Sequence, residues 1–312
     1  MSERQPPAPA PSRALGAGFD APLLVVGVVA VSFSAILIRE AHAPSLTVAL
    51  YRNAIATGLL LPLALTRHRA ELRSLSGRQV GLAVASGAML AVHFATWIQS
   101  LSYTTVAASV VLVTTQPVWT ALGGRLLYGE RLRPRALTAI GVTLVGAAVI
   151  SGGDVALSGR AALGDLLAVI GAVAGGAYFL IGRNLRQDLS LVPYVTIVYA
   201  SCALLLLPAV LVSGTATTRF PAKTWVMFVL LALVPQIMGH TVFNYLLRFL
   251  DPTVVAIAIM GEPIGATLLA LAFYGEVPPW TAVAGGIVVL AGIYVAISAQ
   301  GRRRTIGEAP IE

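Results

Sequence analysis

The chain has 312 residues, of which 57% are hydrophobic and only 11% are charged, and its formal net charge is +8. An ordinary soluble domain has about 25% charged residues, so this composition leaves too little polar surface for a soluble globule. It predicts an integral membrane protein, because the bilayer supplies an apolar solvent and each helical crossing takes about 20 apolar residues.

Residues 1–20 are rich in Pro and Ala and are expected to form a disordered tail. Ten apolar stretches of spanning length follow, separated by short breaks that hold charges and turn formers. They are too long and too uniformly apolar for barrel strands of about ten alternating residues. The sequence predicts an all-α integral membrane protein with ten transmembrane helices, at 22–39, 45–66, 78–100, 105–127, 135–151, 163–183, 191–213, 224–249, 253–275 and 279–299.

Both ends of this series need a separate interpretation. Ala41-His42-Ala43 resembles a signal-peptide cleavage site, but the apolar run before it is longer than the core of a signal peptide. We therefore expect 22–39 to remain as the first helix. Residues 301–312 contain Arg302, Arg303 and Arg304 and are expected to form a basic cytoplasmic tail.

The distribution of Lys and Arg predicts the orientation. With a cytoplasmic N-terminus, the outer connections hold only Arg39, Arg160, Arg219 and Lys223, and Arg52 lies inside the second helix. All the other Lys and Arg residues fall on the inner side, which is a strong positive-inside bias. Both termini are therefore expected in the cytoplasm, and the protein in the cytoplasmic (inner) membrane. The positive charge follows one membrane face and does not indicate nucleic-acid binding.

The chain also repeats itself at one fixed offset. Pro117 recurs as Pro263, and Tyr128-Gly129-Glu130 recurs as Tyr274-Gly275-Glu276, both 146 residues later. The same offset pairs Pro62 with Pro208. We therefore predict two five-helix repeats, at 20–153 and 160–300. Because five is odd, the second repeat is inserted upside down, and carriers use such inverted repeats around a site near the bilayer midplane.

These motifs resemble the EamA family of the drug/metabolite transporter superfamily. The resemblance rests on Pro117 with Tyr128-Gly129-Glu130-Arg131-Leu132, and on Glu262-Pro263 with Tyr274-Gly275-Glu276. Arg52 at the head of the second-helix sequence Arg52-Asn53-Ala54-Ile55 matches as well. The resemblance covers about 22–299. It implies ten helices in inverted repeats and export of small metabolites, with the amino-acid exporters as the expected branch.

Polar side chains within the predicted helices form three stripes at helical spacing. Such groups are costly in a membrane and are default candidates for a substrate pathway, although many only bond a neighbouring helix. Trp97 and Trp119 could equally face lipid or packed helices. The amides, hydroxyls and imidazoles of the stripes would serve both ends of a small zwitterion. The candidate cavity-lining residues are His93, Trp97, Ser100, Ser109, Gln116, Trp119, Thr120, Gln236, His240, Phe243 and Asn244.

Four charged residues have open roles. Arg52 would either extend to the membrane surface or hold a substrate carboxylate. Glu262, beside Pro263, would carry a coupling proton, pair with Arg52 or bond the backbone loosened by the proline. For Glu130 and Glu276, at helix ends, we expect structural ion pairs.

Several classes of site have no signature in the sequence. The phosphate-binding loop of nucleotide hydrolases is missing, so transport would be secondary or facilitated. His-Glu-x-x-His and Gly-x-Ser-x-Gly are also missing, which argues against the intramembrane hydrolases that use them. The dispersed histidines and the lone Cys202 predict no metal site, cofactor or disulfide.

Two classes of function remain after these exclusions. The leading one is a transporter that exports amino acids by alternating access, with drugs, nucleobases or sugar-linked metabolites as alternative substrates. The other class is an intramembrane enzyme or a non-transporting membrane scaffold. The expected partners are a small-molecule substrate and the lipid bilayer, and a monomer is expected, with a dimer as the alternative.

Overall fold

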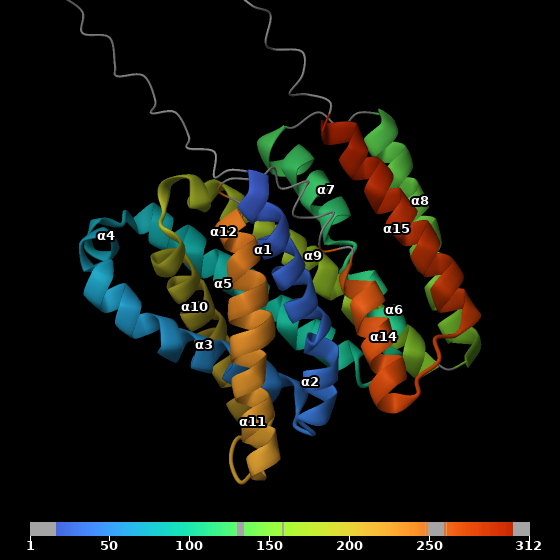
Figure 1. Cartoon of the computed structure of the whole chain (residues 1–312), viewed down its shortest axis with the longest axis horizontal. Helices are drawn as coiled ribbons and strands as arrows, with labels where there is room; N and C mark the ends of the chain where they lie inside the picture. The colour runs from blue at the N-terminus through green and yellow to red at the C-terminus, as the bar shows by residue number, and fades with distance from the viewer. Residues whose placement is uncertain are drawn as a thin grey trace, which may run out of the picture.

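The structure, a computed structural model, describes residues 17–129, 134–157, 159–246, 248, 259 and 261–301. Every regular element among these residues is a helix, which confirms the all-α membrane class (Figure 1). The elements are α1 (Ala17–Ser32), α2 (Ser34–Glu40), α3 (Ser45–Arg67), α4 (Arg69–Ser74), α5 (Gly77–Ser100), α6 (Val106–Val113), α7 (Gln116–Tyr128), α8 (Pro134–Leu157), α9 (Gly159–Asp188), α10 (Leu191–Val212), α11 (Ala222–Leu231), η1 (Ala232–Thr241), α12 (Val242–Leu246), α14 (Glu262–Tyr274) and α15 (Trp280–Gly301). The expected tails, 1–20 and 301–312, lie outside the described residues except for 17–20, which belong to α1, and Gly301, which ends α15.

Seven stretches of the described chain are long and apolar enough to cross a membrane. They correspond to seven of the ten expected spans, and they run Pro22–Glu40, Ser45–Arg67, Gly77–Ser100, Val106–Leu127, Gly159–Asp188, Leu191–Val212 and Ala222–Leu246. The expected spans at 135–151, 253–275 and 279–299 contain the shorter apolar helices Gly141–Ile150, Glu262–Tyr274 and Trp280–Gly292. The count of ten crossings therefore stays a prediction.

The expected helix at 105–127 is in fact two helices, α6 and α7, separated by a turn at Thr114 and Thr115. Their hydroxyls donate to the carbonyls of Val111 at 2.9 Å and Leu112 at 2.8 Å. Pro117 has no N–H to continue the ladder, so the helix restarts at Gln116. The expected span therefore holds, but it is interrupted, because threonine hydroxyls compete for backbone carbonyls without lowering the apolar character of the stretch.

The expected helix at 224–249 changes its winding part-way along. α11 passes into the π-helix η1, which contains Pro235, and then into α12. A ten-residue π-helix is unusual, and such segments are frequent at functional sites. It carries Gln236 and His240, two of the candidate residues.

The helices pack closely where glycine allows it. α5 lies along α9, and α10 lies against α3 and α5, whereas α8 and α15 pair at one edge of the bundle (Figure 1). A Cβ atom added at Gly87 of α5 would lie 2.6 Å from the carbonyl oxygen of Val198 on α10. A Cβ atom at Gly175 of α9 would lie 2.7 Å from Cδ of Gln116. Close approach at these positions brings polar side chains of separate helices together inside the bundle.

Candidate functional site

A small cavity lies inside the bundle where both halves of the chain meet. Its volume is about 20 Å³, enough for a water-sized molecule. An amino acid is larger, so the wall must open for one to enter. The lining residues are Val31, Ser34, His93, Trp97, Val113, Gln116, Phe179, His240, Phe243, Ile259 and Glu262.

Two histidines from distant parts of the sequence face this cavity. His93 on α5 and His240 on η1 have ring centroids 6.3 Å apart, nearly edge to face. Nδ1 of His93 donates to the carbonyl of Gly171 at 2.8 Å, which orients its ring, and the ring stacks on Trp97 at 5.9 Å. His93 and His240, from the third and eighth expected helices, therefore lie at one place.

The wall of the cavity holds polar atoms without protein partners. Nε1 of Trp97 and Nδ1 of His240 are buried and make no hydrogen bond to the described residues. The carboxylate of Glu262, in the first turn of α14, lines the same cavity and belongs to none of the ion pairs of the described residues. Buried polar atoms are nearly always satisfied, so this wall is suited to a ligand that carries its own donors and acceptors.

Arg52 of α3 lies directly behind the wall and is fully buried. Its Nε donates to Oε1 of Gln236 at 2.9 Å, and its Nη1 donates to Oγ of Ser34 at 3.3 Å. Its guanidinium carbon lies 4.0 Å from the ring centroid of Phe94. Extension to the membrane surface was a wrong alternative, because Gln236 and Ser34 hold the side chain inward. The alternative pair with Glu262 is not among the ion pairs of the described residues, and Nη2 has no partner there.

Six other candidates lie outside the cavity wall and bond neighbouring groups. Oγ of Ser100 lies 2.6 Å from Oγ of Ser109, and Nδ2 of Asn244 donates to the hydroxyl of Tyr178 at 2.5 Å. Gln236 supports Arg52. Nε1 of Trp119 donates to Thr115 at 3.1 Å, and Thr120 donates to the Gly176 carbonyl at 3.2 Å.

The sequence stripes indicated Phe243 but missed Ser34 and the rest of the apolar wall, which is Val31, Val113, Phe179 and Ile259. An apolar lining residue resembles any lipid-facing residue, so no stripe marks it. The repeat offset provides the missing signal, since Val113 and Ile259 are 146 residues apart and both line the cavity. The same offset relates Gln116 to Glu262 and Trp97 to Phe243, which line it as well.

Comparison with known proteins decides the family. The EamA-like transporter family matches residues 20–152 and again residues 162–298. The chain belongs to the EamA-like transporter family. It is thus a multi-pass membrane protein of a family of transporters, and its curated relatives are named as transporters and not as enzymes.

Relatives of this EamA chain are distant. An uncharacterized transporter of Archaeoglobus fulgidus is 26% identical over 204 residues, which cover 64% of this chain and 70% of the relative. An uncharacterized transporter of Bacillus subtilis is 24% identical, with 75% of each chain covered. A probable terminal-alkyne amino-acid exporter of Streptantibioticus cattleyicolor is 28% identical, over 63% of this chain and 64% of the relative. One chain of known crystal structure has a TM-score of 0.67 and 17% identity, covering 92% of this chain and 99% of that one, so this EamA chain shares its fold.

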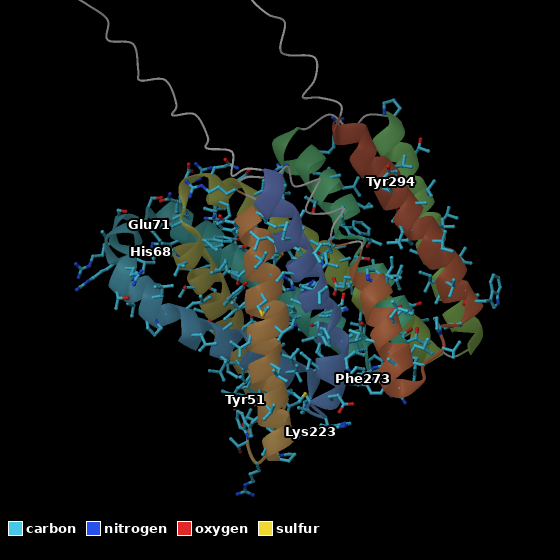
Figure 2. All side chains as sticks on the ribbon, in the orientation of Figure 1. Tyr51, His68, Glu71, Lys223, Phe273 and Tyr294 are labelled. Carbon is cyan, nitrogen blue, oxygen red and sulfur yellow. The ribbon has the colours of Figure 1, made fainter. Side chains whose placement is uncertain are left out.

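One end of the EamA bundle is tied together by ionic contacts. Arg39 at the end of α2 forms an ion pair with Glu276, which follows α14. Oε1 of Glu276 also accepts the backbone N–H of Val106 at 2.8 Å, and Tyr274 donates to Glu40 at 3.1 Å. The expected structural ion pair of Glu276 is therefore confirmed, whereas Glu130 lies outside the described residues. Figure 2 shows Lys223 and Phe273 at this end, with His68 and Glu71 far from them.

Glu71, on the short helix α4 between two spans, joins the two halves elsewhere. Its Oε1 accepts the backbone N–H of Ser190 at 2.6 Å, and its Oε2 lies 3.4 Å from Nδ1 of His68. Partial burial raises the pKa of the Glu71 carboxyl, but the hydrogen bond from Ser190 and the contact with His68 outweigh burial and hold the pKa below its ordinary value.

Acid should therefore weaken the protein through Glu71. Because its pKa is lower in the folded chain, its stabilising contribution is complete above the ordinary pKa of about 4.3 and is lost as the pH falls through the folded value. We expect the melting temperature to drop less between pH 7 and pH 3 in Glu71→Gln than in the wild type. Melting curves of the purified protein test this, and equal drops in both proteins would contradict it.

Proposed function

We propose that this chain is a secondary or facilitated transporter that exports small metabolites, with amino acids first among them, across the cytoplasmic membrane. In this proposal ten helices form two inverted five-helix repeats, and the cavity between them opens to each side in turn. Both termini lie in the cytoplasm, which places the arginine-rich connections on the inner side.

The observation that carries the proposal is the symmetry of the cavity wall. Trp97 and Phe243, Val113 and Ile259, and Gln116 and Glu262 are three pairs of lining residues, each separated by 146 positions. Equivalent positions of two repeats line one cavity only when it lies between them. A site at the interface of inverted repeats is the arrangement that rocking carriers use.

The two half-length helices support the same view. α7 and α14 each have 13 residues and a proline at the second position, and each ends at a glycine in the left-handed conformation, with φ of 66° at Gly129 and 64° at Gly275. Gln116 and Glu262, their first residues, line the cavity. Helices that begin beside a central site are typical of transporters.

Amino acids are the proposed cargo for two reasons. One relative is named as a probable amino-acid exporter, although it is only 28% identical. The surroundings of the cavity also combine a buried guanidinium, Arg52, with a carboxylate, Glu262. Opposite charges beside one cavity fit a zwitterion better than a ligand with a single charge.

Flux measurements test the proposal. Liposomes that contain the protein should take up at least one labelled amino acid faster than protein-free liposomes, and an excess of the same unlabelled amino acid inside should drive counterflow. If no amino acid in a broad panel moves, with or without a proton gradient, amino-acid export is wrong. Panels of nucleobases and sugar-linked metabolites then decide whether transport itself stands.

A further inference from the structure

The polar atoms of the cavity wall differ in what they offer a ligand. Nε1 of Trp97 is a hydrogen-bond donor only, it is buried, and it has no partner among the described residues. Nδ1 of His240 is likewise buried without a partner in the described chain. Both residues line the cavity, so an acceptor oxygen there would pair with the Trp97 N–H and, in the tautomer that carries the proton on Nδ1, with His240.

Arg52 adds positive charge to this donor side. Its guanidinium contacts Ser34, a lining residue, and faces the ring of Phe94, which in turn lies 5.5 Å from the ring of His240. Gln236 and Ser34 are neutral partners, so they orient the guanidinium without cancelling its charge. In a protected interior that charge acts over several ångströms with little screening.

Glu262 offers the opposite chemistry. An ionised carboxylate accepts hydrogen bonds and donates none, and this one lines the same cavity. The rest of the wall is largely apolar, through Val31, Val113, Phe179, Phe243 and Ile259. A ligand that matches every part carries a carboxylate, an ammonium group and an apolar side chain.

We propose that the carboxylate of a zwitterionic ligand binds Nε1 of Trp97 and the His240 imidazole, with Arg52 behind them as a positioning charge, while its ammonium group binds Glu262. This assignment rests on the proposed transport of amino acids and adds the residues that recognise each end. Trp97 and Glu262 thereby become the residues that select a zwitterion over a simple amine or acid.

Three related probes separate the two ends of the ligand. L-leucine has both charges, L-leucinamide lacks the carboxylate, and 4-methylpentanoate lacks the ammonium group. Their affinities are measured by calorimetry on the full chain in lipid nanodiscs. Trp97→Phe removes the N–H and keeps a ring to stack on His93, and Glu262→Gln removes the negative charge at nearly constant size. Trp280→Phe, on a residue that is 77% exposed on α15, is the matched control.

The expected result is a crossed pattern. A hydrogen bond to a charged group changes affinity by about tenfold or more, so Trp97→Phe should weaken L-leucine about tenfold. It should weaken L-leucinamide clearly less, because an amide carbonyl is a neutral and weaker acceptor than a carboxylate. Glu262→Gln should weaken L-leucine and L-leucinamide alike and should not weaken 4-methylpentanoate, which loses a like-charged neighbour. Trp280→Phe should match the wild type with all three probes.

Each other outcome has a definite meaning. If Trp97→Phe weakens L-leucine and L-leucinamide equally, the ring only packs against the ligand and the carboxylate assignment is wrong. If Glu262→Gln leaves L-leucinamide unaffected, the ammonium assignment is wrong. Should a variant fail to fold, the wild type still decides, because equal affinity for all three probes overturns the proposal. If the wild type transports L-leucine but the variants do not give the crossed pattern, only this assignment of residues is wrong. If the wild type neither binds nor transports any zwitterion, the proposed function is wrong as well.

Discussion

Gly146→Ala is expected to lower the melting temperature of the protein clearly. A Cβ atom at Gly146 of α8 would lie 2.7 Å from the backbone nitrogen of Val289 and 2.8 Å from the carbonyl oxygen of Gly285, both on α15. Those atoms are backbone, so no rotamer change relieves the contact and the two helices must move apart. Overpacking of this kind costs about 1–3 kcal/mol.

Gly141→Ala on the same helix is the matched control. A Cβ atom there would have no neighbour within 4 Å, and alanine is the better helix former by up to about 1 kcal/mol. Cys202 is the single cysteine of the chain and is buried in α10, so a thiol-reactive dye reports unfolding in detergent. On heating, Cys202 should react with the dye at a lower temperature in Gly146→Ala than in the wild type. In Gly141→Ala it should react at the wild-type temperature or above. Equal melting of the two variants would show that α8 and α15 do not depend on this contact.

Hydropathy was enough to predict the helical membrane class and seven of the spans. It failed at the local breaks, since they leave the apolar character of a stretch unchanged. The turn at Thr114 depends on two hydroxyls that take over carbonyls one turn back. The π-helix around Pro235 likewise depends on which backbone carbonyl each N–H group bonds. Both features depend on hydrogen bonds within a helix, and the average hydropathy of a sequence segment does not show which hydrogen bonds form.

Most of the polar part of the cavity wall could be predicted, whereas most of the apolar part could not. Helical spacing indicated His93, Trp97 and His240, because polar groups inside a span are few and costly. It also selected Ser100 and Asn244, whose partners are on neighbouring helices, since spacing gives a direction around the helix and not the identity of the neighbour. Arg52 shows the same limit, because only the packed structure reveals Gln236 and Ser34 beside it.

Arg52→Met is expected to remove transport while the fold survives. The native side chain is a buried charge whose hydrogen bonds go to neutral groups, and such charges are expensive in a membrane interior. An unbranched apolar side chain of similar length removes that cost but leaves Oε1 of Gln236 without its donor, so the free energy of unfolding should change little. Leucine flux should fall at least about tenfold, because the positive charge behind the donor side of the cavity is lost.

Arg186→Met is the comparison variant for Arg52→Met. Arg186 is also buried, but its side chain donates hydrogen bonds to backbone carbonyls. Its Nε donates to the carbonyl of Asn244 at 3.1 Å, and its Nη1 donates to the carbonyl of Leu189. Without it, each buried carbonyl left unsatisfied costs about 1–3 kcal/mol, so this variant should melt well below the wild type in the Cys202 labelling assay. If Arg52→Met melts as low as Arg186→Met, Arg52 is a structural residue and its loss of flux says nothing about the ligand. If Arg52→Met melts like the wild type and transports nothing, the charge of Arg52 is retained for transport, and it offsets its desolvation only when a carboxylate enters the cavity.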